Sequence, residues 1–268
     1  EIEANPYILI DVANNVDFKL IDKMAMNLGF EYNNEKRIKS GIKYAISKAT
    51  ANGHCAVLED ELYRFIKVLL GVENDEIEDS VIELKAKGEI VIEEREDNNW
   101  IYLDSYYKAE ESVANKLITL DKARNMKHIN DFEDELEKIE QKTDLILSDK
   151  QKEAIEAVND NNVCIITGGP GTGKTTIIKV ILELYKSKKR KTVLCAPTGR
   201  AAKRMTETTG EEAKTLHRLL EIGKIEEERT SKYNDFDVAP LDADVIIVDE
   251  MSMVDLFLMN YLVKAIYQ

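Results

Sequence analysis

The sequence has few prolines, cysteines and tryptophans, and these low counts exclude several classes of protein. Its 268 residues include only 4 Pro, 3 Cys and 1 Trp, without repeats or low-complexity stretches, which argues against a fibrous or disordered chain. The cysteines are too few and too widely spaced for a disulfide scaffold or a metal site, so we expect Cys55, Cys164 and Cys195 to be buried thiols.

Long apolar runs are also missing. No run approaches the roughly 18 residues of a membrane span, and the first residues lack a signal-peptide pattern. We therefore expect a cytoplasmic protein without membrane partners. With 44% hydrophobic and 33% charged residues, the composition is that of an ordinary soluble protein with one large domain or two to three small ones.

The formal charge of −14 is unevenly distributed. Residues 1–140 carry 31 acidic and 18 basic side chains, a net charge of −13, whereas residues 141–268 carry 20 and 19, a net charge of −1. Bases cluster at 186–191 and 200–204. We interpret the first cluster mainly as the solvated end of a helix, where cations interact favourably with the helix dipole. Nucleic-acid contact remains the alternative.

A glycine-rich segment supplies the strongest chemical signal. Residues 168–175 read Gly-Gly-Pro-Gly-Thr-Gly-Lys-Thr, the G-x-x-x-x-G-K-[ST] spacing whose backbone N–H groups surround phosphate oxygens. We expect Lys174 to reach the β- and γ-phosphates of ATP and Thr175 to bind Mg²⁺. The predicted nucleotide-binding residues of this segment are Gly168, Gly169, Pro170, Gly171, Thr172, Gly173, Lys174, Thr175 and Thr176.

Three β-branched runs predict a parallel sheet around this segment. We expect strands over 163–167, 192–196 and 245–248, with a crossover helix over 175–185. This is the pattern of an α/β P-loop domain. Asp249 and Glu250 follow the third run, at the edge where ligands bind such sheets. We expect Asp249 to hold the Mg²⁺ shell, through water, and Glu250 to polarise the attacking water.

Two further segments separate these motifs. Residues 197–204 predict the end of a strand, a turn and the basic start of a helix. This turn is either purely structural or contacts nucleic-acid phosphates. Residues 215–220 read Thr-Leu-His-Arg-Leu-Leu, in which a lone histidine is more often a packed or capping residue.

Taken in order, these four segments resemble motifs I, Ia, Ib and II of the RecD/TraA-type DNA helicases of superfamily 1. The resemblance implies that the P-loop domain is of RecA-like type. It also implies ATP-driven translocation along single-stranded DNA, from 5′ to 3′, with ATP and Mg²⁺ as cofactors. It also implies a role in recombination or repair. The residues that it places along the DNA path are Thr198, Gly199, Arg200, Thr215 and His217.

The resemblance extends upstream to residues 147–155, which look like the Q motif of this family. It implies that Gln151 reads the edge of the adenine base. Ser148 and Gln151 also form an S-x-x-Q capping box at the start of a helix. Both roles remain open for Gln151.

The N-terminal half resembles the accessory domains of the longer RecD-like helicases. We expect a helix-hairpin-helix-like domain over 1–52, with a short helix opened by residues 5–7 and a second over 18–28 that stops at Gly29. Its hairpin, residues 13–17, lacks the glycines that present backbone amides to DNA. A structural role is therefore the leading interpretation.

The next segment, 53–105, predicts a winged-helix-like domain: two helices, then two strands around a turn at 96–99. Its second helix is acidic, which repels phosphate, so we interpret the domain as a docking or spacer module. A helical connection over 106–142 and a truncated first motor domain over 143–268 complete the predicted organisation. The acids of the second helix are Asp75, Glu76, Glu78, Asp79 and Glu83.

Family motifs III to VI have no counterpart in these 268 residues, so we do not expect this piece to unwind DNA alone. An alternative function is a P-loop ATPase that acts as a nucleotide-dependent switch, with a repair or replication protein docked on its acidic N-terminal domains. A scaffold with a dead nucleotide site would need damaged motifs. Lys174, Thr175, Asp249 and Glu250 are all present.

Overall fold

The computed structural model describes residues 2, 4–12, 17–123, 128–222 and 238–266. The chain forms two compact units, Glu1–Lys108 and Ala109–Gln268. Within the described residues, no helix has the length and apolarity needed to cross a membrane.

Unit 1 begins with helices. Asp17 caps the second of them through a hydrogen bond from the Lys19 N–H, and the chain leaves it at Gly29, which has a φ of 88°. This helix matches the one expected over 18–28. The short first helix starts later than expected, because residues 5–7 form turns that lead into it. The helices are α1 (Ile8–Val12), α2 (Phe18–Asn27) and α3 (Glu35–Ala51); hairpin residues 13–16 lie outside the described part.

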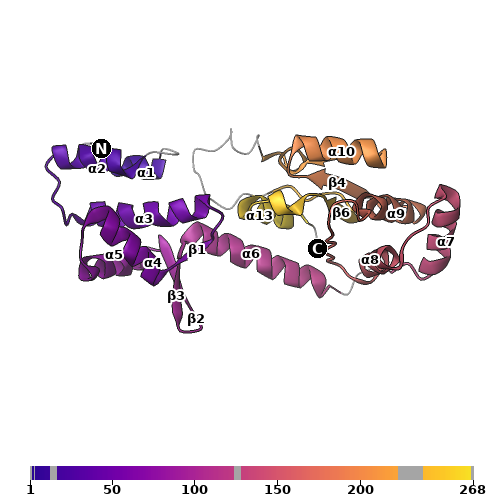
Figure 1. Ribbon diagram of the computed structural model, residues 1–268, viewed down its shortest axis with the longest axis horizontal. Coiled ribbons are helices and arrows are strands. Elements are labelled where there is room, and N and C mark those ends of the chain that lie inside the picture. The colour runs from indigo at the N-terminus through magenta and orange to yellow at the C-terminus, as the bar shows by residue number, and fades with distance from the viewer. Residues whose placement is uncertain (1, 3, 13–16, 124–127, 223–237, 267–268) are drawn as a thin grey trace. The chain divides into compact units, whose positions relative to one another are not determined.

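The rest of unit 1 has the element order of a winged helix when α3 is counted as its first helix. Antiparallel strands pair in the order β1-β3-β2, and Figure 1 shows β2 and β3 as a hairpin. Its turn is shorter than the expected 96–99, because Glu96 and Asp97 take positive φ values of 49° and 51°, as a two-residue hairpin turn requires. The elements are β1 (Ala56–Leu58), α4 (Glu59–Leu70), α5 (Asn74–Ala86), β2 (Ile90–Arg95) and β3 (Asn98–Leu103).

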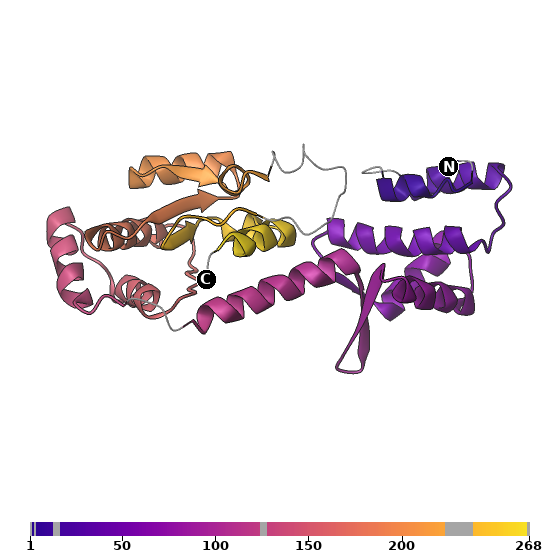
Figure 2. The same ribbon diagram turned by 180° about the vertical axis from the view of Figure 1, so that it is seen from behind.

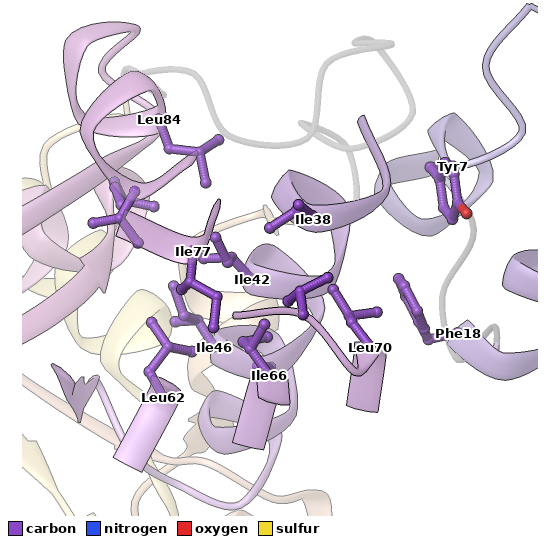
Figure 3. Close-up of a cluster of buried hydrophobic side chains, with 14 of the residues drawn as sticks. Tyr7, Phe18, Ile38, Ile42, Ile46, Leu62, Ile66, Leu70, Ile77 and Leu84 are labelled. Atoms are coloured by element: carbon purple, nitrogen blue, oxygen red, sulfur yellow. The ribbon is translucent and has the colours of Figure 1, made fainter. Parts of the chain in front are cut away.

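One hydrophobic core runs through unit 1. Figure 3 shows side chains of α3, α4 and α5 that point toward one another, among them Ile42, Ile66 and Ile77. Tyr7 and Phe18 belong to the same cluster, and their rings stack with centroids 5.9 Å apart. The helical N-terminus and the winged-helix elements therefore share a core.

Unit 2 contains a parallel sheet with helices on both faces, which confirms the predicted α/β P-loop class. Its strands pair in the order β5-β4-β6. In both views α10 lies along β4 (Figures 1 and 2). After α6 (Asp104–Asp121), which starts in unit 1, come α7 (Phe132–Thr143), α8 (Asp149–Asp160), α9 (Lys174–Ser187), β4 (Thr192–Ala196), α10 (Gly199–Thr209), β5 (Ala213–Thr215), α11 (Leu216–Leu219), β6 (Val245–Val248), the 3₁₀ turn Met251–Met253 and α13 (Leu256–Ala265).

The two faces of this sheet have separate cores. Leu194 of β4 and Ile247 of β6 pack with α9 and α10. Cys195 and Val248, their neighbours in sequence, pack instead with α11 and α13. This alternation is what a strand covered on both faces produces.

The strand expected over 163–167 is absent, and this prediction was wrong. The segment Val163–Thr167 pairs with no strand, Ile165 is 89% exposed, and only Ile166 packs into a core. A β-branched run forms a strand only where a neighbouring strand bonds its peptide groups. Cys164 is therefore exposed rather than buried, whereas Cys195 is buried as expected and Cys55 is half-buried.

Candidate nucleotide-binding site

The glycine-rich segment forms a loop that ends at the first turn of α9. Gly171 and Gly173 have φ values of 77° and 87°, which side chains other than glycine rarely adopt. Gly173 is the N-cap residue of α9, and Lys174, Thr175 and Thr176 form its first turn. The N–H groups of that turn have no partner within the helix, so this helix start can bind an anion.

Lys174 folds back over the loop. Its Nζ donates hydrogen bonds to the carbonyls of Gly168, at 2.5 Å, and Gly169, at 2.8 Å. The Thr172 hydroxyl also donates to the Gly169 carbonyl, at 2.9 Å. The ammonium group thus lies within the loop, where it can exchange carbonyl oxygens for phosphate oxygens.

Gln151 joins α8 to this loop. Its Oε1 accepts a hydrogen bond from the Ser148 N–H, at 2.9 Å, which forms the predicted capping box. Its Nε2 donates to the Thr172 carbonyl, at 3.4 Å, and lies 2.2 Å from where a Cβ on Gly173 would stand. Capping therefore uses the oxygen of the amide, and contact with the phosphate loop uses its nitrogen.

Asp249 and Glu250 follow β6 directly. The Asp249 N–H continues the sheet by donating to the Cys195 carbonyl, at 3.0 Å, and the Asp249 carboxylate accepts from the Glu250 N–H, at 2.9 Å. Glu250 has a φ of 54°, a conformation that costs a non-glycine residue of order 1–3 kcal/mol and is typical of functional sites. Both side chains are placed by backbone geometry at the end of the strand.

The oxygen donors present fit a magnesium ion. Mg²⁺ at phosphate sites takes one or two carboxylates together with phosphate oxygens and water. Thr175 and Asp249 offer a hydroxyl and a carboxylate of this kind. Among the described residues, no three His, Cys, Asp or Glu side chains are grouped so that they alone could hold a metal ion. No hydrogen bond or ion pair recorded for the described chain joins the phosphate loop to Asp249 or Glu250.

The residues expected along a DNA path lie at one edge of the sheet. Parallel pairing sets Ala196 of β4 opposite Thr215 of β5, so the turns that follow both strands emerge together. Thr198 and Thr215 cap α10 and α11, accepting hydrogen bonds at 3.2 Å from the N–H groups of residues 201 and 218. Both threonines therefore have a structural role in addition to any DNA contact.

The other three residues of the predicted DNA path are exposed to solvent. Gly199 and Arg200 begin α10, His217 lies on α11, and all three are exposed. Sequence reasoning did not single out Arg218, which is exposed beside His217. Its position within the Thr-Leu-His-Arg run was the available signal.

The basic cluster 186–191 has partners within unit 2. Lys186 pairs with Glu211, at 2.9 Å, Lys188 pairs with Asp131, at 2.9 Å, and Lys191 pairs with Asp242. Arg190 lies over the Tyr185 ring, 5.1 Å from its centroid. These contacts favour the structural interpretation of the cluster.

Comparison with known proteins matches two parts of the chain. A family model described as the ATP-dependent RecD2 DNA helicase HHH domain matches residues 1–56, and one for an AAA domain matches residues 151–268. The first match agrees with the predicted helix-hairpin-helix outline. The second covers the phosphate loop and the acidic pair.

Curated relatives include three helicases or helicase subunits. The ATP-dependent RecD2 DNA helicase of Deinococcus radiodurans is 40% identical over 120 residues, which are 45% of this chain and 16% of the relative. The RecBCD enzyme subunit RecD of Buchnera aphidicola subsp. Acyrthosiphon pisum is 35% identical, with 62% of this chain and 30% of the relative covered. The ATP-dependent DNA helicase dda of Enterobacteria phage T4 is 34% identical, with 45% and 29% covered. The chain spans less than a third of each relative.

Proposed function

We propose that this chain supplies the ATP-binding part of a motor that moves 5′ to 3′ along single-stranded DNA. The chain carries the N-terminal region and the first motor domain of a RecD-like helicase. A role in DNA recombination or repair and a cytoplasmic location belong to the same proposal. The relatives named as ATP-dependent DNA helicases support it.

The observation that carries the proposal is the register of the sheet. Pairing of Cys195 with Val248 and of Ala196 with Thr215 brings the ends of three strands to one edge. Those ends lead into the acidic pair and into both turns of the proposed DNA path. Ligands of open α/β sheets bind at this edge, so ATP hydrolysis and DNA contact can be coupled over a short distance.

Each residue of the site then has a role. Lys174 exchanges its two loop carbonyls for the β- and γ-phosphates of ATP, and Gln151 reads the adenine. Thr175 and Asp249 hold Mg²⁺, which neutralises charge on the phosphate oxygens when bound. Glu250 orients a water molecule and accepts its proton during attack on the γ-phosphate.

Lys174→Ala tests the nucleotide site. Charge-assisted hydrogen bonds contribute about 1.5–3 kcal/mol each, and the two carbonyl contacts that Lys174 gives up offset part of this gain. We expect a loss of about 2 kcal/mol, roughly 30-fold in Kd, for a fluorescent ATP analogue. The matched control is Lys179→Ala, an exposed lysine of the same helix, which should bind like the wild type.

Equal affinity in Lys174→Ala and the control would refute the nucleotide site. Rapid hydrolysis without dependence on DNA would instead contradict the translocase while leaving the site intact. The two measurements therefore separate ATP binding from motor function.

A nucleotide-dependent switch for a protein partner is the second candidate. One observation favours it: the surface of α5 exposes Asp75, Glu78 and Asp79 together with Ile82, which is 56% exposed. Acids around an apolar side chain suit a basic protein partner better than DNA. Hydrolysis stimulated by single-stranded DNA would favour the motor over the switch.

A further inference from the structure

Gln151 makes a contact through each end of its side-chain amide, and each end keeps a further hydrogen-bonding position. An amide oxygen accepts two hydrogen bonds and an amide nitrogen donates two. Within the described chain, Oε1 accepts one, from the Ser148 N–H at 2.9 Å, and Nε2 donates one, to the Thr172 carbonyl at 3.4 Å. One acceptor position and one donor position therefore remain for a ligand.

These two positions match adenine and not guanine. Adenine offers a donor, its N6 amino group, beside an acceptor, N7, whereas guanine offers two acceptors, O6 and N7. The match depends on which way the amide of Gln151 faces. Turning the amide over would set its nitrogen against the Ser148 N–H and its oxygen against the Thr172 carbonyl, so the two contacts fix its orientation.

The Ser148 N–H that holds the amide oxygen is itself positioned from another helix. Leu147, the preceding residue, is 5% exposed and packs in the core shared by α7, α8 and α9, which lie together in both views (Figures 1 and 2). Its N–H donates to Oε1 of Glu140 in α7, at 2.9 Å. Core packing and this hydrogen bond therefore fix the backbone from which the Ser148 N–H projects.

Glu140 is itself firmly held. Its Oε2 accepts a hydrogen bond from Nζ of Lys152, at 2.9 Å, and its side chain is only 17% exposed. The ammonium group of Lys152, followed by the Leu147 N–H, keeps the pKa of the Glu140 carboxyl below its usual value. Glu140 is therefore a charged acceptor at neutral pH, and charge-assisted hydrogen bonds are stronger than neutral ones. One carboxylate thus ties α7 both to the segment before α8 and to the first turn of α8.

We propose that Glu140 is a positioning residue for base recognition, which orients the Gln151 amide toward adenine through Leu147 and Ser148. The inference deepens the proposed function, since it rests on Gln151 reading the adenine. Glu140 lies outside the helicase motifs, in the helix that precedes them. The preference for ATP over GTP then depends on a carboxylate that does not itself contact the base.

Competition of ATP and of GTP against a fluorescent ATP analogue tests this role. A good two-point contact discriminates between bases by roughly 5- to 140-fold, so Glu140→Ala, which removes both acceptors, should lower the ratio of the GTP Kd to the ATP Kd by about fivefold or more. Glu140→Gln keeps an oxygen that can accept from the Leu147 N–H and should retain most of the preference. The matched control is Glu137→Ala, an exposed glutamate of the same helix, which should leave the ratio unchanged.

A second pair of variants covers the case in which Glu140→Ala does not fold, as judged by circular dichroism. Ser148→Pro removes the N–H that holds the Gln151 oxygen, and proline suits the φ of −71° at this position. Ser148→Ala also loses the capping hydroxyl but keeps that N–H. The ratio should therefore be lower in Ser148→Pro than in Ser148→Ala, by about fivefold or more.

Gln151→Ala separates the positioning role from the adenine contact. If it lowers the ratio while Glu140→Ala and Ser148→Pro leave the ratio unchanged, the positioning role is overturned and the adenine contact stands. The positioning role also fails if Glu137→Ala lowers the ratio as much as Glu140→Ala does. If the unsubstituted chain binds ATP and GTP equally, or if Gln151→Ala leaves the ratio unchanged, the adenine contact of the proposed function is itself contradicted.

Discussion

Arg37 is the side chain whose removal should destabilise unit 1 most clearly. It is 2% exposed, and its Nε and Nη2 donate to the two carboxylate oxygens of Asp22 at 2.8 and 3.0 Å. Its Nη1 donates to the carbonyls of Tyr32 and Leu70. The Tyr7 hydroxyl donates to the same aspartate, at 2.7 Å. One guanidinium thus ties α2 to α3 and to the end of α4.

The expected cost follows from what Arg37→Met leaves behind. Methionine keeps much of the aliphatic stem, so the loss is mainly electrostatic. Asp22, only 17% exposed, is left without its cation, and removing one partner of such a buried pair costs about 3–5 kcal/mol. We expect about 4 kcal/mol, a large part of the roughly 5–15 kcal/mol that stabilises a typical domain.

Urea unfolding followed by tryptophan fluorescence measures this change. The single tryptophan, Trp100, lies on β3 of unit 1, so the signal reports that unit alone. The matched control is Arg64→Met on α4, because Arg64 is exposed and, among the described residues, donates only to the Asp60 carbonyl in its own helix. The control should lose less than about 0.5 kcal/mol.

A double-mutant cycle separates the ion pair from simple packing. With Arg37→Met already present, Asp22→Asn should cost less than it does in the unsubstituted chain, because the uncompensated charge is gone. A loss below about 1 kcal/mol for Arg37→Met, or strict additivity of the two substitutions, would refute the reasoning.

Two further predictions concern the sites of unit 2. Gly173→Ala should weaken fluorescent ATP binding by about tenfold, because alanine is strained at a φ of 87° and its Cβ would displace the Gln151 amide. The control is Gly199→Ala, which has open space at its Cβ. Equal weakening of ATP binding by both substitutions would count against the effect. Arg200→Ala should lower the salt-dependence slope of single-stranded DNA binding by about 0.7, the loss of one phosphate contact; an unchanged slope would remove Arg200 from the DNA path.

Local signals in the sequence were enough for the elements that depend on local geometry. Helix α2 begins after Asp17 and ends before Gly29, because an N-cap side chain and a glycine in the left-handed conformation each act on the adjacent backbone. The run 245–248 was expected as a buried strand and forms β6. The loop before α9 was equally predictable, because the glycines that its positive φ values require are visible in the sequence.

Contacts between distant residues were not predictable in this way. The run 163–167 has strand composition, but a strand also needs a partner edge, and composition does not say whether that edge is occupied. Arg37 is one of several bases in its helix, and only the fold places Asp22 and two carbonyls around its guanidinium. Two roles, helix capping and adenine contact, stayed open for Gln151, because the sequence does not show which atom of its side-chain amide makes which contact.

The bases of unit 2 show why net charge alone could not locate a nucleic-acid surface. The denser cluster, 186–191, is largely paired with acids or stacked on Tyr185, so little of its charge is free to attract phosphate. By contrast, Arg200, Arg204 and Arg218 are exposed and take part in no ion pair of the described chain. A phosphate backbone competes with water and counterions at these three arginines, but with carboxylates at 186–191. Binding of single-stranded DNA should therefore depend on the sparser set.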